Sequence, residues 1–105
     1  MSDIPERDWK YLRSIQPEML EELSRRINDE VRALLARGDL SEREKRAELY
    51  GLVKRRDKIV ALCFDDWRRS TILVSCLALR RHGLLTSAHL EKLDPETQSR
   101  IRFGE

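Results

Sequence analysis

Hydrophobic positions recur at helical spacing over most of this chain, and the longest such stretch covers residues 41–82. At about 100° per residue, one side of a helix through this stretch is mostly apolar, while Lys, Arg and Asp collect on the opposite side. The residues on the apolar side are Leu49, Leu52, Val53, Ile59, Val60, Cys63, Phe64, Trp67, Thr71, Val74, Leu77 and Ala78. The pattern predicts a long helix with one buried face and one solvated face.

Both ends of this stretch carry helix boundary signals. Ser41 and Glu44 have the spacing of a capping box, in which the serine hydroxyl accepts from the third helical N–H and the glutamate reaches back. At the other end, Arg80 and Arg81 suit the negative end of the helix dipole, and Gly83 can adopt the left-handed conformation that closes a helix. The predicted element therefore has a defined start and a defined stop.

A straight helix of this length does not fit a compact chain of 105 residues. It would span roughly 60 Å, whereas a domain of this size has a radius of gyration of about 13 Å. Either the helix bends or breaks between Phe64 and Thr71, where residues of low helix propensity cluster, or a second copy covers the protruding apolar face. We expect two helices or one bent helix, and dimerisation is a separate expectation.

Two helices are predicted in the first third of the chain. Asp3 and Pro5 are a capping residue and a first-turn proline, and they open a short helix that ends near Ser14. Pro17 then begins a second helix that ends at Arg37. Its apolar residues recur at spacings of three and four: Leu20, Leu23, Ile27, Val31, Leu34 and Leu35.

The turn at residues 38–40 is too short for anything but a reversal of the chain. The 17–37 helix should therefore pair antiparallel with the helix that begins at Ser41. Short helices at residues 86–93 and 94–101 complete the chain. The sequence predicts a single all-α domain, a helical bundle built on an antiparallel hairpin with a long central helix and short terminal helices.

Composition supports this fold class and excludes others. Charged residues make up 38% of the chain, but its regular apolar stripes argue against disorder. The apolar run at residues 72–79 is far shorter than the roughly 20 residues that span a bilayer, so we expect no membrane partner. Cys63 and Cys76 lack the spacing of a metal pair or a redox dithiol, and no signal segment is visible. We therefore expect a cytoplasmic protein with reduced cysteines.

No motif indicates catalysis or a bound cofactor. The sequence contains no Gly-rich phosphate loop, no Gly-x-Ser-x-Gly and no Cys/His nucleophile arrangement. His82 and His89 are separated by a predicted helix break and belong to no metal-binding spacing. Asp65 and Asp66 point about 100° apart on a helix and cannot converge as an acid/base pair. We expect no enzyme activity, no metal and no cofactor.

The preferred hypothesis is a small non-enzymatic interaction or assembly protein, either a homodimer or a module that binds another protein. Trp67 and Arg68 are of the residue types that dominate interfaces when desolvated, and the run at 72–79 is apolar on all sides. The predicted interface residues are Arg56, Phe64, Trp67, Arg68, Ile72, Leu73, Cys76 and Leu79.

Arg56 is a separate case because it falls on the apolar side of its helix. Such an arginine most often extends its methylene groups along the apolar surface and keeps its guanidinium in water. The sharper prediction is a carboxylate partner within the chain or across an interface, such as Glu22 or Glu30, because a desolvated guanidinium is costly on its own.

The alternative hypothesis is a regulatory protein that binds nucleic acid. Residues 54–81 hold eight Lys or Arg against three Asp. A net charge of +2 is nevertheless low for a nucleic-acid-binding domain, and interleaved acids are also typical of a self-paired surface. The candidate nucleic-acid contacts are Lys54, Arg55, Lys58, Arg69 and Arg80.

Overall fold

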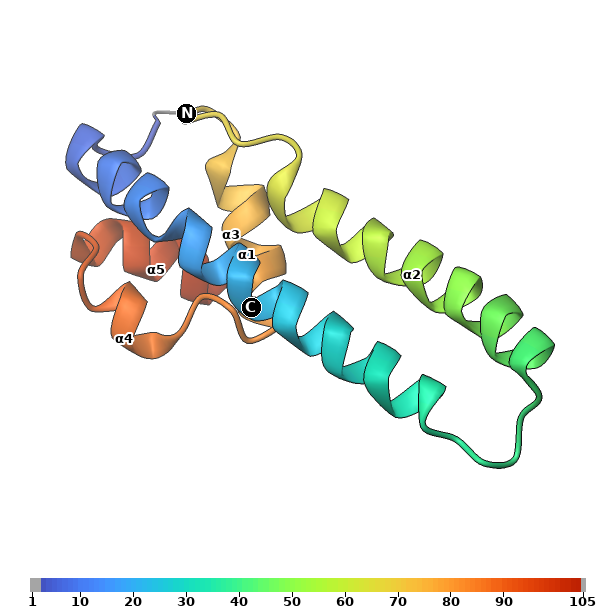
Figure 1. Cartoon of the computed structure of the whole chain (residues 1–105). Helices are drawn as coiled ribbons and strands as arrows, with labels where there is room; N and C mark the ends of the chain where they lie inside the picture. The colour runs from blue at the N-terminus through green and yellow to red at the C-terminus, as the bar shows by residue number, and fades with distance from the viewer. Residues whose placement is uncertain (1–2, 105) are drawn as a thin grey trace.

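The computed structural model describes residues 3–104, which form five helices (Figure 1). They are α1 (Glu6–Leu35), α2 (Glu42–Phe64), α3 (Ile72–Arg81), α4 (Ser87–Leu90) and α5 (Pro95–Phe103). No strand occurs in this part of the chain. The predicted all-α class is confirmed, and α1 and α2 form the predicted antiparallel hairpin.

The first helix is continuous through Pro17, so the predicted break between Ser14 and Pro17 is wrong. The N-cap position is Pro5 and no side chain caps this end, so the predicted cap at Asp3 is wrong as well. Proline removes one helical hydrogen bond, to the carbonyl of Arg13. Arg13 and Pro17 are both exposed, so water can donate a hydrogen bond to the Arg13 carbonyl instead. On the opposite face of the helix, side chains before and after the proline are buried, namely Leu12, Ile15, Met19 and Leu23. This burial keeps the two halves of the helix collinear.

The central stretch contains two helices, α2 and α3, joined by residues 65–71, so the expected break is confirmed. The indole N–H of Trp67 donates to the carbonyl of Cys63 at 2.7 Å. That carbonyl belongs to the last turn of α2 and has no partner within the helix. The bond helps to close α2 where the chain turns toward α3.

The predicted boundary signals of this stretch also form. The Ser41 hydroxyl accepts from the Glu44 N–H at 3.1 Å, and the Glu44 carboxylate accepts from the Ser41 N–H at 2.8 Å. Gly83 has a φ of 68°, and the Leu84 N–H donates to the Leu79 carbonyl at 2.8 Å. This is the Schellman arrangement, which requires a left-handed residue after the helix.

The molecule is elongated, with extents of 53 × 23 × 23 Å and a radius of gyration of 16.8 Å. In Figure 1 the second half of α1 and most of α2 run side by side and extend away from the other helices. We call this two-helix extension, residues 24–60, the arm. Residues 3–23 and 61–104 form the globular end.

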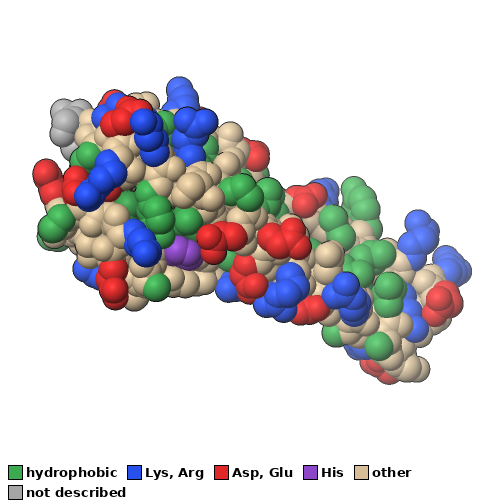
Figure 2. Space-filling model, turned by 60° about the vertical axis from the view of Figure 1, so that its left-hand side comes forward, with side chains coloured by type: hydrophobic (Ala, Val, Ile, Leu, Met, Phe, Trp, Pro, Cys, Tyr) green, Lys and Arg blue, Asp and Glu red, His purple; other side chains and the backbone are tan. Residues whose placement is uncertain are grey.

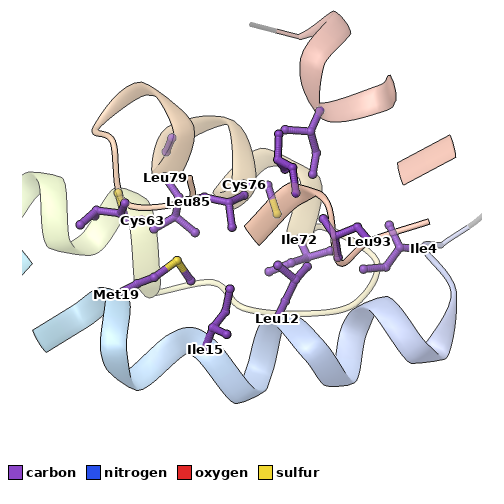
Figure 3. Close-up of a cluster of buried hydrophobic side chains, with 14 of the residues drawn as sticks. Ile4, Leu12, Ile15, Met19, Cys63, Ile72, Cys76, Leu79, Leu85 and Leu93 are labelled. Carbon is purple, nitrogen blue, oxygen red and sulfur yellow. The ribbon is translucent and has the colours of Figure 1, made fainter. Parts of the chain in front are cut away.

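The hydrophobic core lies in the globular end (Figure 3). It combines side chains from the first half of α1, the end of α2, most of the apolar residues of α3 and the segments that follow α3. The labelled members are Ile4, Leu12, Ile15, Met19, Cys63, Ile72, Cys76, Leu79, Leu85 and Leu93. Because these segments cover α3 on all but its outer side, a helix that is apolar on most sides can be accommodated inside one chain.

A buried carboxylate ties α5 to α1. Asp8 is 0% exposed, and it accepts a hydrogen bond from the Thr97 hydroxyl at 2.6 Å. It also accepts from the Asp94 N–H at 3.2 Å and lies 3.8 Å from the Arg7 guanidinium. Arg7 pairs in addition with the Asp94 side chain. The N-terminal end of α5 is therefore fixed to the beginning of α1.

Candidate interaction surfaces

Three of the predicted interface residues cannot form an interface, which corrects that prediction. Ile72, Cys76 and Leu79 are each 0% exposed inside the single chain. The all-round apolar character of this segment was a correct sign of burial, but the elements that bury it belong to the same molecule. The residues of α3 that reach the surface lie on its outer side, and Val74 is 65% exposed.

The aromatic residues among the predicted contacts form a half-buried cluster. The rings of Phe64 and Trp67 are stacked with centroids 6.2 Å apart, and the Trp9 ring lies 6.4 Å from that of Trp67. The exposed Arg68 pairs with Asp66 at 2.9 Å, within the same connection. This cluster packs against the core, so its main role is to hold the 65–71 connection on α1.

Arg56 has the carboxylate partner that the sequence predicts, and the partner is Glu30. Two hydrogen bonds of 2.9 and 2.8 Å join the guanidinium to the carboxylate across the arm. The hydrogen bond from Arg56 lowers the pKa of Glu30 below its usual value. The pair connects α1 with α2 inside one chain.

The predicted nucleic-acid contacts are divided between the two parts of the molecule. Arg69 donates to the Ile4 carbonyl at 2.8 Å and pairs with Glu6 at 3.0 Å, which holds the start of the chain on the globular end. Arg80 donates to the Leu85 carbonyl at 3.1 Å. The remaining three, Lys54, Arg55 and Lys58, are exposed on α2 in the arm.

A first apolar surface lies on the arm. A shallow groove of about 500 Å³ is lined there by Arg46, Ala47, Leu49, Tyr50 and Val53. Tyr50 is 70% exposed and Val53 is 38% exposed. We call the four uncharged residues, Ala47, Leu49, Tyr50 and Val53, the arm patch. The structure describes every residue from 24 to 60, and among these only Leu52 is buried, so the arm has almost no core of its own.

A second apolar surface lies between α3 and α5, which pack against each other in the globular end. A groove of about 470 Å³ is lined by Leu73, Leu77, Ser99, Arg100 and Phe103. An adjoining hollow shares Leu73 and Arg100 and adds Val74. Phe103 is 95% exposed. We call Leu73, Val74, Leu77 and Phe103 the α3–α5 patch.

Sequence reasoning found only part of these surfaces. Leu73 is among the predicted contacts, whereas Phe103 is not, because the last predicted helix ends at residue 101. A usable signal was present, because Ile101 and Phe103 are two positions apart and cannot share one face of a helix. Since Ile101 is buried, Phe103 must point outward.

Within residues 3–104, no group of three or more His, Cys, Asp or Glu side chains could hold a metal ion. No helix in this range is long and apolar enough to cross a membrane.

Cys63 and Cys76 are buried free thiols, and burial raises the pKa of Cys76 to about 12. His89 is engaged locally, since its Nδ1 accepts from the Thr86 N–H at 3.0 Å.

No protein-family model matches this chain, and no curated protein or solved structure is significantly similar to it.

Proposed function

We propose that this chain is a non-enzymatic assembly protein that self-associates through its arm. In the proposed homodimer, the arms of two copies pack antiparallel and form a four-helix bundle. The observation that carries the proposal is the lack of burial in the arm. A two-helix hairpin can bury only the strip between its helices, and here a single side chain, Leu52, is buried.

The apolar side chains exposed on the arm resemble those of a four-helix bundle from which two helices are missing. Tyr50 and Val53 border the groove of the arm patch, and Leu35 at the end of α1 is 47% exposed. In four-helix bundles such positions face a second pair of helices. A second arm would supply that pair.

The charges around the arm patch are compatible with pairing of identical surfaces. Arg43 and Arg46 lie within a turn of the patch on α2, and so do Glu44 and Glu48. Figure 2 shows hydrophobic, basic and acidic side chains next to one another along the arm. A two-fold contact can therefore place carboxylates of one copy against cations of the other.

Sedimentation equilibrium over about 1–300 μM tests the proposal, because a small interface dissociates within this range. The expected result is a reversible dimer. Tyr50→Glu and Val53→Glu should each weaken it at least about tenfold, since each places a charge in the apolar contact. The matched control is Leu62→Glu, which introduces the same charge at a 50% exposed leucine of α2 outside the arm patch. A monomer at every concentration would remove the proposal.

The alternative function, nucleic-acid binding, is supported by one feature of the arm. Lys54, Arg55 and Lys58 are exposed, and the Lys54 ammonium lies 5.8 Å from the centre of the Tyr50 ring. Exposed aromatic rings beside cations are typical of surfaces that bind single strands. A titration with labelled single-stranded DNA at increasing salt separates the two functions, because such binding must weaken steeply with salt.

A further inference from the structure

We infer that the α3–α5 patch is the docking site for a different protein, which inserts an amphipathic helix whose apolar face is flanked by carboxylates. This inference concerns the globular end and is independent of the arm. It rests on three features of the patch: its exposure, its grooved shape and the sign of the charges around it.

The exposure of the patch is large for side chains of this type. Phe103 is 95% exposed and Val74 is 65% exposed, although they lie on helices that contact each other. Single exposed apolar residues are ordinary, but adjoining ones that border a groove are typical of binding sites. The inner wall is Leu73 and Leu77, which are half-buried and belong also to the edge of the core.

The shape of the patch suits a helix. Leu73 and Leu77 are four residues apart, so they lie above one another on the same side of α3, while Phe103 rises from α5 across the groove. A ligand helix presents apolar side chains at the same spacing of three and four residues. The groove of about 470 Å³ has room for a few such side chains.

The charges around the patch are mostly positive. Among the described residues that line this groove and the two hollows beside it, the cations are Arg69, Arg80, Arg81 and Arg100, and the one carboxylate is Asp3. Arg69 adds little to this basic rim, because its charge is balanced by the ion pair with Glu6. The exposed Arg102 on α5 adds a further cation, whose guanidinium donates to the neutral Gln98 amide.

This charge distribution indicates which class of partner is complementary to the patch. A second copy that docked through the same face would bring arginines against arginines, which is repulsive. An acidic amphipathic helix matches both the apolar centre and the basic rim. Nucleic acid is less well suited, because aliphatic side chains, which offer no stacking surface, occupy most of the centre where its backbone or bases would lie.

The probe for the test is a fluorescein-labelled synthetic peptide of about 16 residues, with Leu and Phe at helical spacing and Glu at the flanking positions. A second probe carries Lys in place of every Glu. Fluorescence anisotropy is measured with the full chain. Saturable binding of the acidic probe is expected, at least about tenfold tighter than that of the basic probe and weaker at high salt.

Three variants locate the binding site. Val74→Glu and Phe103→Glu change exposed side chains and should each weaken binding of the acidic probe at least about tenfold. The double variant Arg81→Glu with Arg102→Glu should lose the acidic probe and gain the basic one, which a loss of folding cannot produce. The control, Leu62→Glu at an exposed leucine of α2 outside both patches, should bind the acidic probe as the unchanged chain does.

Five outcomes would overturn the inference. The first three are the absence of saturable binding of the acidic probe, equal binding of both probes, and binding that the α3–α5 variants leave unchanged. The fourth is a single-stranded oligonucleotide that binds more tightly than the peptide and is lost in Phe103→Glu. The fifth is a dimer that Val74→Glu abolishes in sedimentation equilibrium, which would make a second copy the occupant of the patch. Circular dichroism confirms that every variant is folded.

Discussion

Replacing Asp8 by alanine should destabilise the protein more than a typical surface substitution. The carboxylate is fully buried and accepts from the Thr97 hydroxyl at 2.6 Å and from the Asp94 N–H at 3.2 Å. Both donors lose their acceptor in the alanine variant. Arg7 is exposed and 3.8 Å away, so its ion pair with Asp8 contributes little.

The magnitude follows from these bonds. A hydrogen bond to a charged acceptor is worth about 1.5–3 kcal/mol, and removal of the buried charge recovers part of its desolvation cost. We expect Asp8→Ala to lower the free energy of unfolding by about 2–4 kcal/mol, a large share of the roughly 5–15 kcal/mol of a typical domain. Thr97→Val, which removes one donor and keeps the volume, should cost about 1–2 kcal/mol.

Urea denaturation followed by circular dichroism measures both values, and the double variant completes a thermodynamic cycle. Because Asp8 and Thr97 bond directly, the double variant should lose about 1 kcal/mol less than the sum of the single losses. A loss below about 1 kcal/mol for Asp8→Ala, or strict additivity, would show that the carboxylate does not hold α5 in the described way.

Three further predictions concern single features. Arg56→Met should lower the free energy of unfolding by about 0.5–1 kcal/mol, since the pair with Glu30 is partly exposed, and an unchanged or raised urea midpoint would contradict a stabilising role. Gly83→Ala should cost about 1–2 kcal/mol in the same assay, because the residue has a φ of 68°. Cys63 and Cys76 should react with a disulfide reagent at pH 8 only after unfolding, because burial raises the pKa of both thiols; rapid labelling of the native chain would refute their burial.

Local structure could be predicted from the residues alone wherever short-range interactions decide it. The capping box at Ser41 and the glycine after α3 involve atoms a few residues apart, so their spacing is sufficient to predict them. The break at 65–71 follows from the same kind of local preference. The local signal is insufficient at Pro17, where a helix break is predicted and the helix continues. The burial of residues before and after the proline outweighs the one lost hydrogen bond.

The surfaces were decided by the tertiary structure. Periodicity shows which residues share a face of a helix, but not whether another element covers that face. Leu79 and Val74 both belong to the apolar α3, yet one is enclosed by other segments and the other is 65% exposed. The position of Phe103 beside α3 depends on the Asp8 anchor of α5, a contact between opposite ends of the chain. Such long-range contacts produce no recognisable pattern of residue spacing in the sequence. They nevertheless determine which apolar residues remain exposed and available for a partner.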